Sequence, residues 1–186
     1  MNQQSVVQYR QAPLRAAYKE HPERALIVKR AWTVFDVAHD PFHGVVVPGE
    51  PYRVSWHYGT DRAVGGFHDA PNPGELLCAA VAACQDGTLR MVAELFGVTL
   101  HHVEVEVTGK VDVRGSMAVD RQVSVGFESL QCKVRFRAAP GTPPELCQRL
   151  IAQAERSCIN LQTLRAGVPV DASFEGVFLS PHSAER

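Results

Sequence analysis

The five cysteines are the residues of this 186-residue chain best suited to covalent chemistry. They stand at positions 78, 84, 132, 147 and 158, an odd number without a CxxC pair. This pattern fits neither a secreted disulfide framework nor a zinc ribbon, and in a reducing compartment most of these residues are expected to be free thiols. Any catalysis is therefore expected to be thiol chemistry. The alternative for Cys78, Cys132 and Cys147 is that each is a small buried apolar side chain.

Two of these thiols, Cys78 and Cys84, lie in a stretch that predicts one long helix over residues 72–97. Asn72 is suited to cap the start of the helix, with Glu75 completing a capping box, and the glycine at position 97 is suited to end it. Few charged residues interrupt the apolar interior of this stretch, so most of the helix surface is expected to be buried. The helix is therefore predicted to be the central element of the fold.

The phase of this helix separates the two thiols. At about 100° per residue, Cys78 lies roughly 120° around the helix from Cys84. The two thiols are therefore expected to face different neighbours. One face is predicted to hold Leu77, Ala80, Val81, Cys84, Thr88 and Met91.

The remaining sequence predicts an α+β fold with a mainly antiparallel sheet. Strand patterns precede the long helix and follow it, and period-two alternation between valine and glutamate or threonine over 103–108 indicates a strand with one wet face. A second helix is expected over 143–158, with Thr142 as its cap and Glu145 closing a capping box. It carries Cys158 near its end or at a joint with a short helix. The expected strands are 25–35, 43–47, 52–58, 98–113, 121–128, 131–139 and 168–179, and the short helix is 159–167.

Three segments are distinguished by composition. Residues 1–24 are polar and are expected to form a loose arm with about one helical turn, suited to packing on a partner surface. Residues 25–180 form the predicted domain, and 181–186 are a polar tail.

Charge and hydropathy restrict the choice of partners. The formal charge is −1, from 19 basic and 20 acidic residues, and no run of like charge favours nucleic acid or an anionic membrane surface. The longest stretch without a charged residue is the ten residues 76–85, well short of a membrane span, and the N-terminal residues lack an apolar signal core. We therefore expect a cytoplasmic protein that binds neither nucleic acid nor membrane.

The histidines give little indication of a metal site. His39 and His43 are spaced four apart, but they fall in a predicted loop and no HExxH motif or Cys/His cluster accompanies them. The sequence therefore predicts no bound metal, and the chemistry considered below needs no organic cofactor.

Two cysteine motifs resemble those of a known family. PNPGELLCAAVAAC followed by TLRMVAELFGV, and AERSCINLQTLR some seventy residues later, resemble the OsmC/Ohr family of osmotically inducible and organic hydroperoxide resistance proteins. The resemblance covers roughly residues 25–175. It implies an OsmC-like fold in which two long central helices of an intertwined homodimer are wrapped by strands of both subunits, with active sites at the subunit interface.

The resemblance also implies a reaction. By position, Cys84 matches the cysteine that attacks the peroxide, and Cys158 matches the cysteine that resolves the resulting sulfenic acid as a disulfide. The substrate would be an organic hydroperoxide, reduced to an alcohol, and a lipoyl-like dithiol would reopen the disulfide. The resemblance therefore favours a thiol peroxidase.

Two departures from the family pattern concern the groups around Cys84. Family members that reduce hydroperoxides efficiently have an arginine in the loop between the first two strands and a glutamate directly after the proline that starts the long helix. Here that loop has no arginine, and Gly74 stands after the proline, with Glu75 one place later. Glu75 is then either a cap or an active-site residue. His68 and Asp69, just before the helix, are candidates to border the pocket. The candidates for the missing cation are His39, His43, Arg53, His57 or a basic residue of the other subunit.

Two other functions remain open from the sequence. A non-catalytic protein with the same scaffold could bind a small hydrophobic ligand in the cleft between its subunits, a reading favoured by the missing arginine and the displaced glutamate. A thiol redox sensor would form the disulfide but turn over slowly with a reductant.

Overall fold

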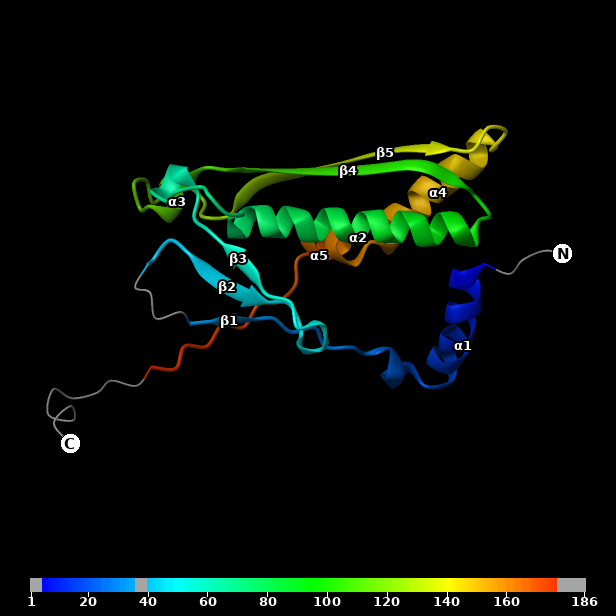
Figure 1. Ribbon diagram of the computed structural model, residues 1–186, viewed down its shortest axis with the longest axis horizontal. Coiled ribbons are helices and arrows are strands. Elements are labelled where there is room, and N and C mark those ends of the chain that lie inside the picture. The colour runs from blue at the N-terminus through cyan, green and yellow to red at the C-terminus, as the bar shows by residue number, and fades with distance from the viewer. Residues whose placement is uncertain (1–4, 36–39, 177–186) are drawn as a thin grey trace, which may run out of the picture.

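The computed structural model describes residues 5–35 and 40–176 and has the predicted α+β architecture, with one long helix and two antiparallel sheets (Figure 1). The helices are α1 (Val6–Glu20), α2 (Pro73–Leu95), α3 (Val113–Ser116), α4 (Pro144–Ser157) and α5 (Ile159–Ala166), with 3₁₀ turns η1 (Pro22–Ala25), η2 (Glu50–Tyr52) and η3 (Arg62–Val64). The strands are β1 (Trp32–Val34), β2 (Gly44–Val47), β3 (Trp56–Tyr58), β4 (Leu100–Val111) and β5 (Phe127–Ala138).

Helix α2 forms as the sequence predicts because the residues at its two ends favour a helix start and a helix end. The backbone amide of Glu75 donates to Asn72 Oδ1 at 3.0 Å, and the backbone amide of Asn72 donates to Glu75 Oε2 at 2.9 Å. These two bonds form the predicted capping box. At the other end, Gly97 has a φ of 68°, a left-handed conformation that glycine adopts without the steric cost of a side chain.

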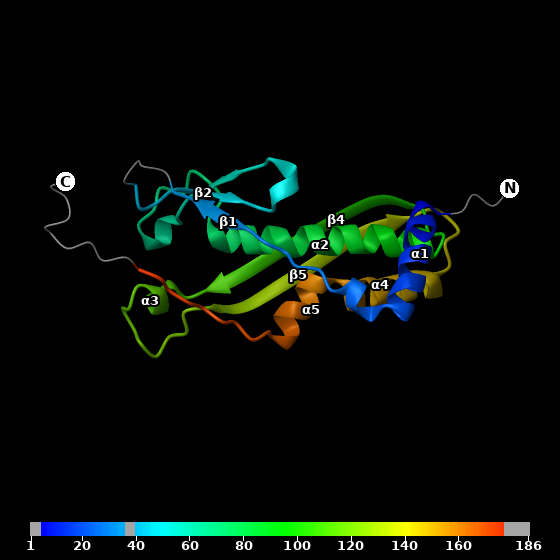
Figure 2. The ribbon, with the colours of Figure 1, turned by 90° about the horizontal axis from the view of Figure 1, so that it is seen from below.

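The core lies where α2 meets three other elements. Figures 1 and 2 show the β4–β5 ribbon running along α2, while α4 and α5 pack against the same helix. Buried side chains from α2, α4 and the turn between α2 and β4 form one cluster, and half-buried side chains of β4 and β5 cover it. The buried members are Leu89, Val92, Ala93, Val98, Leu150 and Ala154. This packing fixes the position of α2 against the joint between α4 and α5.

The strands confirm the predicted period-two pattern. In β4, Val103, Val105 and Val107 are half-buried while Glu104 and Glu106 are exposed, so one face of the β4–β5 sheet covers the helix and the other is wet. Strands β1, β2 and β3 form a separate antiparallel meander, also as predicted.

Several predicted strands are shorter, merged or missing. Only residues 32–34 of the predicted strand 25–35 pair with a neighbour, and the predicted strands 121–128 and 131–139 are replaced by the single strand β5. Residues 168–176 form no strand, and residues 177–179 lie outside the described part of the chain. Apolar β-rich composition favours an extended backbone, but a strand also needs a partner edge.

The predicted cap of the second helix is wrong. The N-cap of α4 is Pro143, without a side-chain cap bond, and the helix begins one residue later than expected. The Thr142 hydroxyl instead donates to the carbonyl of Ala139 at 2.7 Å. Threonine hydroxyls bond to nearby backbone groups in turns as readily as at helix caps, and here the hydroxyl bonds within the turn before α4.

The first 24 residues hold more structure than one helical turn. Helix α1 has 15 residues and includes Pro13, with Ser5 as its cap. Both views place the start of α1 next to the C-terminal end of α2 (Figures 1 and 2), and the backbone amide of Val7 donates to Glu94 Oε1 of that helix at 3.3 Å. Proline interrupts the backbone bonding of a helix but does not forbid it, so tertiary contacts decide here.

One helix of the described residues, α2, is long and apolar enough to cross a membrane by length and composition alone. In the structure α2 packs on β4, α4 and α5, but only 33% of this apolar stretch is buried within one subunit, so one subunit alone does not bury most of the helix surface as predicted.

A pair of thiols at the joint between α4 and α5

Cys84 stands near the middle of α2 and is half-buried. It lines a cavity of about 950 Å³ between α2, α1 and the joint of α4 with α5. Thr88 and Met91, which the sequence placed on the face of Cys84, line the same cavity. The cavity gives a small molecule access to this thiol.

Cys158 lies at the joint itself. It is the C-cap of α4 and the N-cap of α5, with non-helical φ and ψ of −75° and 105°. Its side chain is fully buried, and its thiol lies next to that of Cys84. The structure therefore brings together the two cysteines that the sequence singled out, and all five cysteines are free thiols.

Two side-chain bonds hold the joint in place. Asn160 Nδ2 donates to the carbonyl of Ala80 on α2 at 2.8 Å, and Gln162 Nε2 donates to the carbonyl of Glu155 on α4 at 2.8 Å. Since Asn160 follows Cys158 by two residues and Ala80 precedes Cys84 by one turn, the first bond fixes the register of the two thiols. This register is the main geometric feature of the site.

Burial raises the pKa of the Cys158 thiol above its ordinary value. The neighbouring Cys84 and Cys132 sulfurs raise this pKa further, and the nearby backbone amide of Leu161 partly opposes them. Desolvation also raises the pKa of Cys132. Because a buried thiolate is costly in an apolar surrounding, both groups are neutral thiols at pH 7.

Helix α1 supplies polar groups that the sequence analysis missed. Gln8, Gln11 and Arg15 line the Cys84 cavity. An Arg15 guanidinium N–H donates to Gln11 Oε1 at 3.0 Å, and Gln11 Nε2 approaches Met91 Sδ at 3.9 Å. The spacing of these three residues, i, i+3 and i+7, is that of one helix face and is visible in the sequence. The sequence could not show that this face of α1 lines the same cavity as Cys84.

The predicted pocket residues Glu75, His68 and Asp69 line a different cavity, of about 1110 Å³, at the start of α2. Cys78 lies in this second cavity, which agrees with the predicted separation of the two thiols. Within one subunit the structure therefore gathers these three residues around Cys78. That these residues border the pocket of Cys84 stays a prediction.

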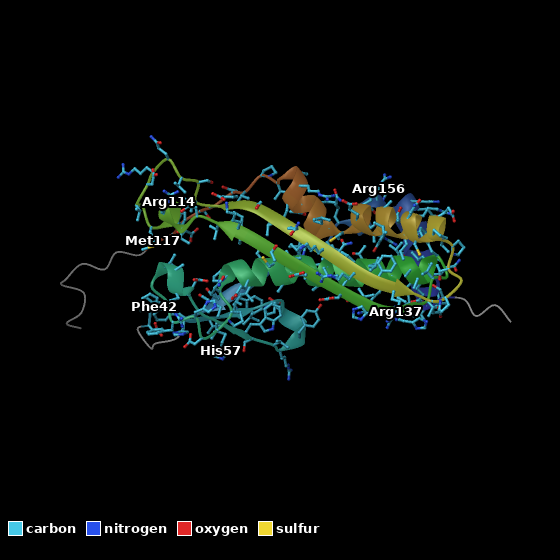
Figure 3. All side chains as sticks on the ribbon, turned by 90° about the horizontal axis from the view of Figure 1, so that it is seen from above. Phe42, His57, Arg114, Met117, Arg137 and Arg156 are labelled. Carbon is cyan, nitrogen blue, oxygen red and sulfur yellow. The ribbon has the colours of Figure 1, made fainter. Side chains whose placement is uncertain are left out.

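The candidate cations of the first strands also lie away from Cys84 within the subunit. Arg53 and His57 are exposed, and Figure 3 shows His57 at the outer side of the β1–β3 meander, far from the α4–α5 joint. His43 is held between the carboxylates of Asp40 and Asp69, the latter at 2.8 Å from Nε2, and these bonds raise the pKa of His43. His39 lies outside the described residues.

No group of three or more histidine, cysteine, aspartate or glutamate side chains within residues 5–35 and 40–176 is arranged to hold a metal ion. The chemistry that the arrangement can perform is that of two adjacent thiols beside an accessible cavity with one arginine on its wall.

Comparison with known proteins finds a matching family model. The family model described as OsmC-like protein matches residues 66–173, which is more than half of the chain and includes both Cys84 and Cys158. No curated protein matches this sequence.

Solved structures share the fold at low sequence identity. An OsmC-like protein from Mycoplasma pneumoniae is 12% identical with a TM-score of 0.59, and the match covers 76% of this chain and 89% of that one. An organic hydroperoxide resistance protein from Elizabethkingia anophelis is 21% identical with a TM-score of 0.55, covering 76% and 91%. An OsmC-like protein of unknown function from Vibrio cholerae is 8% identical with a TM-score of 0.60, covering 74% and 94%. These likenesses show the fold alone.

Proposed function

This chain belongs to the OsmC-like protein family, and from that premise we propose that it is a thiol peroxidase that reduces organic hydroperoxides to alcohols. The observation that carries the proposal is the pairing of an accessible thiol, Cys84, with a buried one, Cys158, at the α4–α5 joint. A second thiol beside the first is what a peroxidatic cysteine needs to escape over-oxidation.

The proposed cycle has three steps. The Cys84 thiolate attacks the outer oxygen of the hydroperoxide, an S–O bond forms as the O–O bond breaks, and the departing alkoxide takes up a proton to become the alcohol. Cys158 then attacks the sulfenic sulfur, which forms a disulfide and releases water. A dithiol reductant, lipoyl-like by family resemblance, exchanges with this disulfide and restores both thiols.

Arg15 is proposed as the cation that the Cys84 cavity offers to the reacting peroxide. It lines the same cavity, and a guanidinium is charged at any working pH. A guanidinium there also offers N–H donors to the leaving oxygen of the peroxide. The arginine absent from the loop after the first strand would then be replaced from α1.

We also propose a cytoplasmic homodimer. Several large apolar side chains are exposed on the single chain, with Val28 at 93% and Phe174 at 95%, and they fall on segments that lack sheet partners. Exposed apolar surface of this kind marks a protein interface. Free thiols at all five cysteines suit a reducing compartment.

The test uses the fully reduced protein and cumene hydroperoxide in stopped flow, followed by peptide mapping. One equivalent of peroxide should be consumed rapidly, and Cys84 and Cys158 should then be joined. If the wild type reacts no faster than Cys84→Ser, the peroxidase proposal fails. Steady-state turnover with dihydrolipoamide separates an enzyme from a redox sensor, since a sensor forms the disulfide but turns over slowly.

A further inference from the structure

A third cavity, of about 540 Å³, lies between α2, the β4–β5 sheet and helices α4 and α5. Most of the residues that line it are apolar, with Val107, Leu130, Val134, Phe136, Leu161 and Leu164 among them. Its volume is within the range of roughly 300–1,000 Å³ that small-molecule sites occupy. None of the residues that line it lines the Cys84 cavity.

Gln85 is the feature of this cavity that packing does not explain. Its side chain is only 4% exposed and lines the cavity, and its Oε1 atom has no hydrogen-bond partner among the described residues. A buried amide oxygen without a donor is unfavourable, and native proteins rarely leave one unpaired. Gln85 follows Cys84 on α2, about 100° further around the helix, which turns it from the Cys84 cavity toward this one.

The charges on the cavity wall cancel. Arg165 and Glu155 both line it, and an Arg165 Nη2 donates to Glu155 Oε1 at 2.6 Å. The remaining titratable group is Cys132, whose raised pKa keeps it a neutral thiol at pH 7. The wall therefore carries no free charge that would attract an anion or a cation.

We propose that this cavity binds a neutral, elongated apolar molecule with one hydroxyl group, whose O–H donates to Gln85 Oε1. The apolar walls take the hydrocarbon part, and the single buried acceptor selects a ligand that brings a donor. This binding site adjoins the buried Cys158 through Cys132 and Leu161 but shares no lining residue with the Cys84 cavity, and the proposal does not depend on peroxidase activity.

Two isomeric probes test whether the ligand must donate an O–H to Gln85 Oε1. The reduced full-length protein is titrated with n-octanol and with methyl heptyl ether, and the methyl groups of its valine and leucine side chains are followed by NMR. The ether has the same atoms as the alcohol but no O–H. The alcohol should bind roughly tenfold more tightly, because the ether leaves the amide oxygen unpaired. Shifts should centre on Val134 and Leu130, while Val92 of the Cys84 cavity stays unchanged.

Two variants separate this site from general apolar binding. Gln85→Leu should abolish the preference for the alcohol over the ether, because the acceptor is gone while the volume is kept. Gln153→Leu, on the wall of the Cys84 cavity, should keep the preference. Equal binding of the two probes by the wild type, no saturable binding, or shifts centred on the Cys84 cavity would each overturn the proposal. Loss of peroxidase activity in any of these proteins would not bear on it.

Discussion

Cys84 and Cys78 stand on the same helix, six residues apart, and both are half-buried, yet their surroundings differ in kind. Cys84 faces the α4–α5 joint, where a second thiol is fully buried beside it. Cys78 faces the start of α2, and the described lining of its cavity holds no other cysteine. The helix presents two equivalent thiols, so the elements packed on each face decide which of them can perform redox chemistry.

The polar groups of the two cavities differ as well. Near Cys78, Glu75 is engaged in the capping box of α2, and His68 pairs with Asp61 at 3.4 Å. Near Cys84, Arg15 bonds only to the neutral amide of Gln11 among its described contacts and keeps its full charge for the cavity. Groups that hold structure lie beside Cys78, and the group available to stabilise an anion lies beside Cys84.

The sharpest test of this comparison is a pair of serine substitutions. Cys84→Ser should slow hydroperoxide consumption by at least roughly a hundredfold, because the attacking thiolate is removed. Cys78→Ser should leave the rate within about twofold, since that thiol faces another cavity. Stopped-flow kinetics with cumene hydroperoxide measures both. A large loss in Cys78→Ser with unchanged circular dichroism would break the comparison.

Removing the thiol of Cys158 should change the oxidation product of Cys84 but not the rate at which Cys84 attacks the peroxide. In Cys158→Ser, the Cys84 sulfenic acid has no resolving partner, so excess peroxide should add further oxygens to give sulfinic and sulfonic acids. Intact mass spectrometry of wild type and variant after the same peroxide pulse shows this. The control is Cys147→Ser, a half-buried thiol on α4, which should still close the Cys84–Cys158 disulfide.

The pH dependence of disulfide closure follows from the raised pKa of Cys158. Only the thiolate attacks, so below this pKa the closure rate should rise by about tenfold per pH unit, and it should level off only above the ordinary thiol range. Rapid-quench mass spectrometry of the sulfenic form between pH 6 and about pH 10 follows the rate. A plateau near neutral pH would contradict burial as the cause that governs Cys158.

A smaller effect on the rate of peroxide attack is expected from replacing Arg15. Arg15→Leu should slow peroxide attack by about tenfold, because the leaving oxygen of the peroxide loses a guanidinium N–H donor. Arg10→Leu is the matched control, since Arg10 is on the same helix but does not line the Cys84 cavity. Equal losses in both variants would point to the docking of α1 instead.

Sequence and structure agree where the determinants are local. The ends of α2 were predictable because Asn72, Glu75 and the glycine at position 97 act within one helical turn of each end. The period-two pattern of β4 was predictable because one covered face is enough to impose it. The separation of Cys78 from Cys84 followed from helix geometry alone.

The rest depends on contacts between distant segments. Arg15 reaches the Cys84 cavity only because α1 docks on the far half of α2, through bonds such as that from Val7 to Glu94. No local pattern indicates which face α1 covers. The unpaired oxygen of Gln85 is equally invisible in the sequence, since it depends on α4, α5 and β5 surrounding one side chain.

The smallest expected effect concerns Glu75. The test shows whether this residue only caps α2 or also takes part in the reaction. Glu75→Ala should lower the free energy of unfolding by about 0.5–1 kcal/mol, because the amide of Asn72 loses its acceptor. Glu75→Gln should restore most of this stability, since glutamine serves in the same capping box. Urea unfolding at fixed protein concentration measures both, and peroxide consumption should be unchanged in both. If Glu75→Gln keeps its stability but reacts several-fold more slowly, the carboxylate takes part in the chemistry. The cavity at the start of α2 would then have to meet the Cys84 of another subunit.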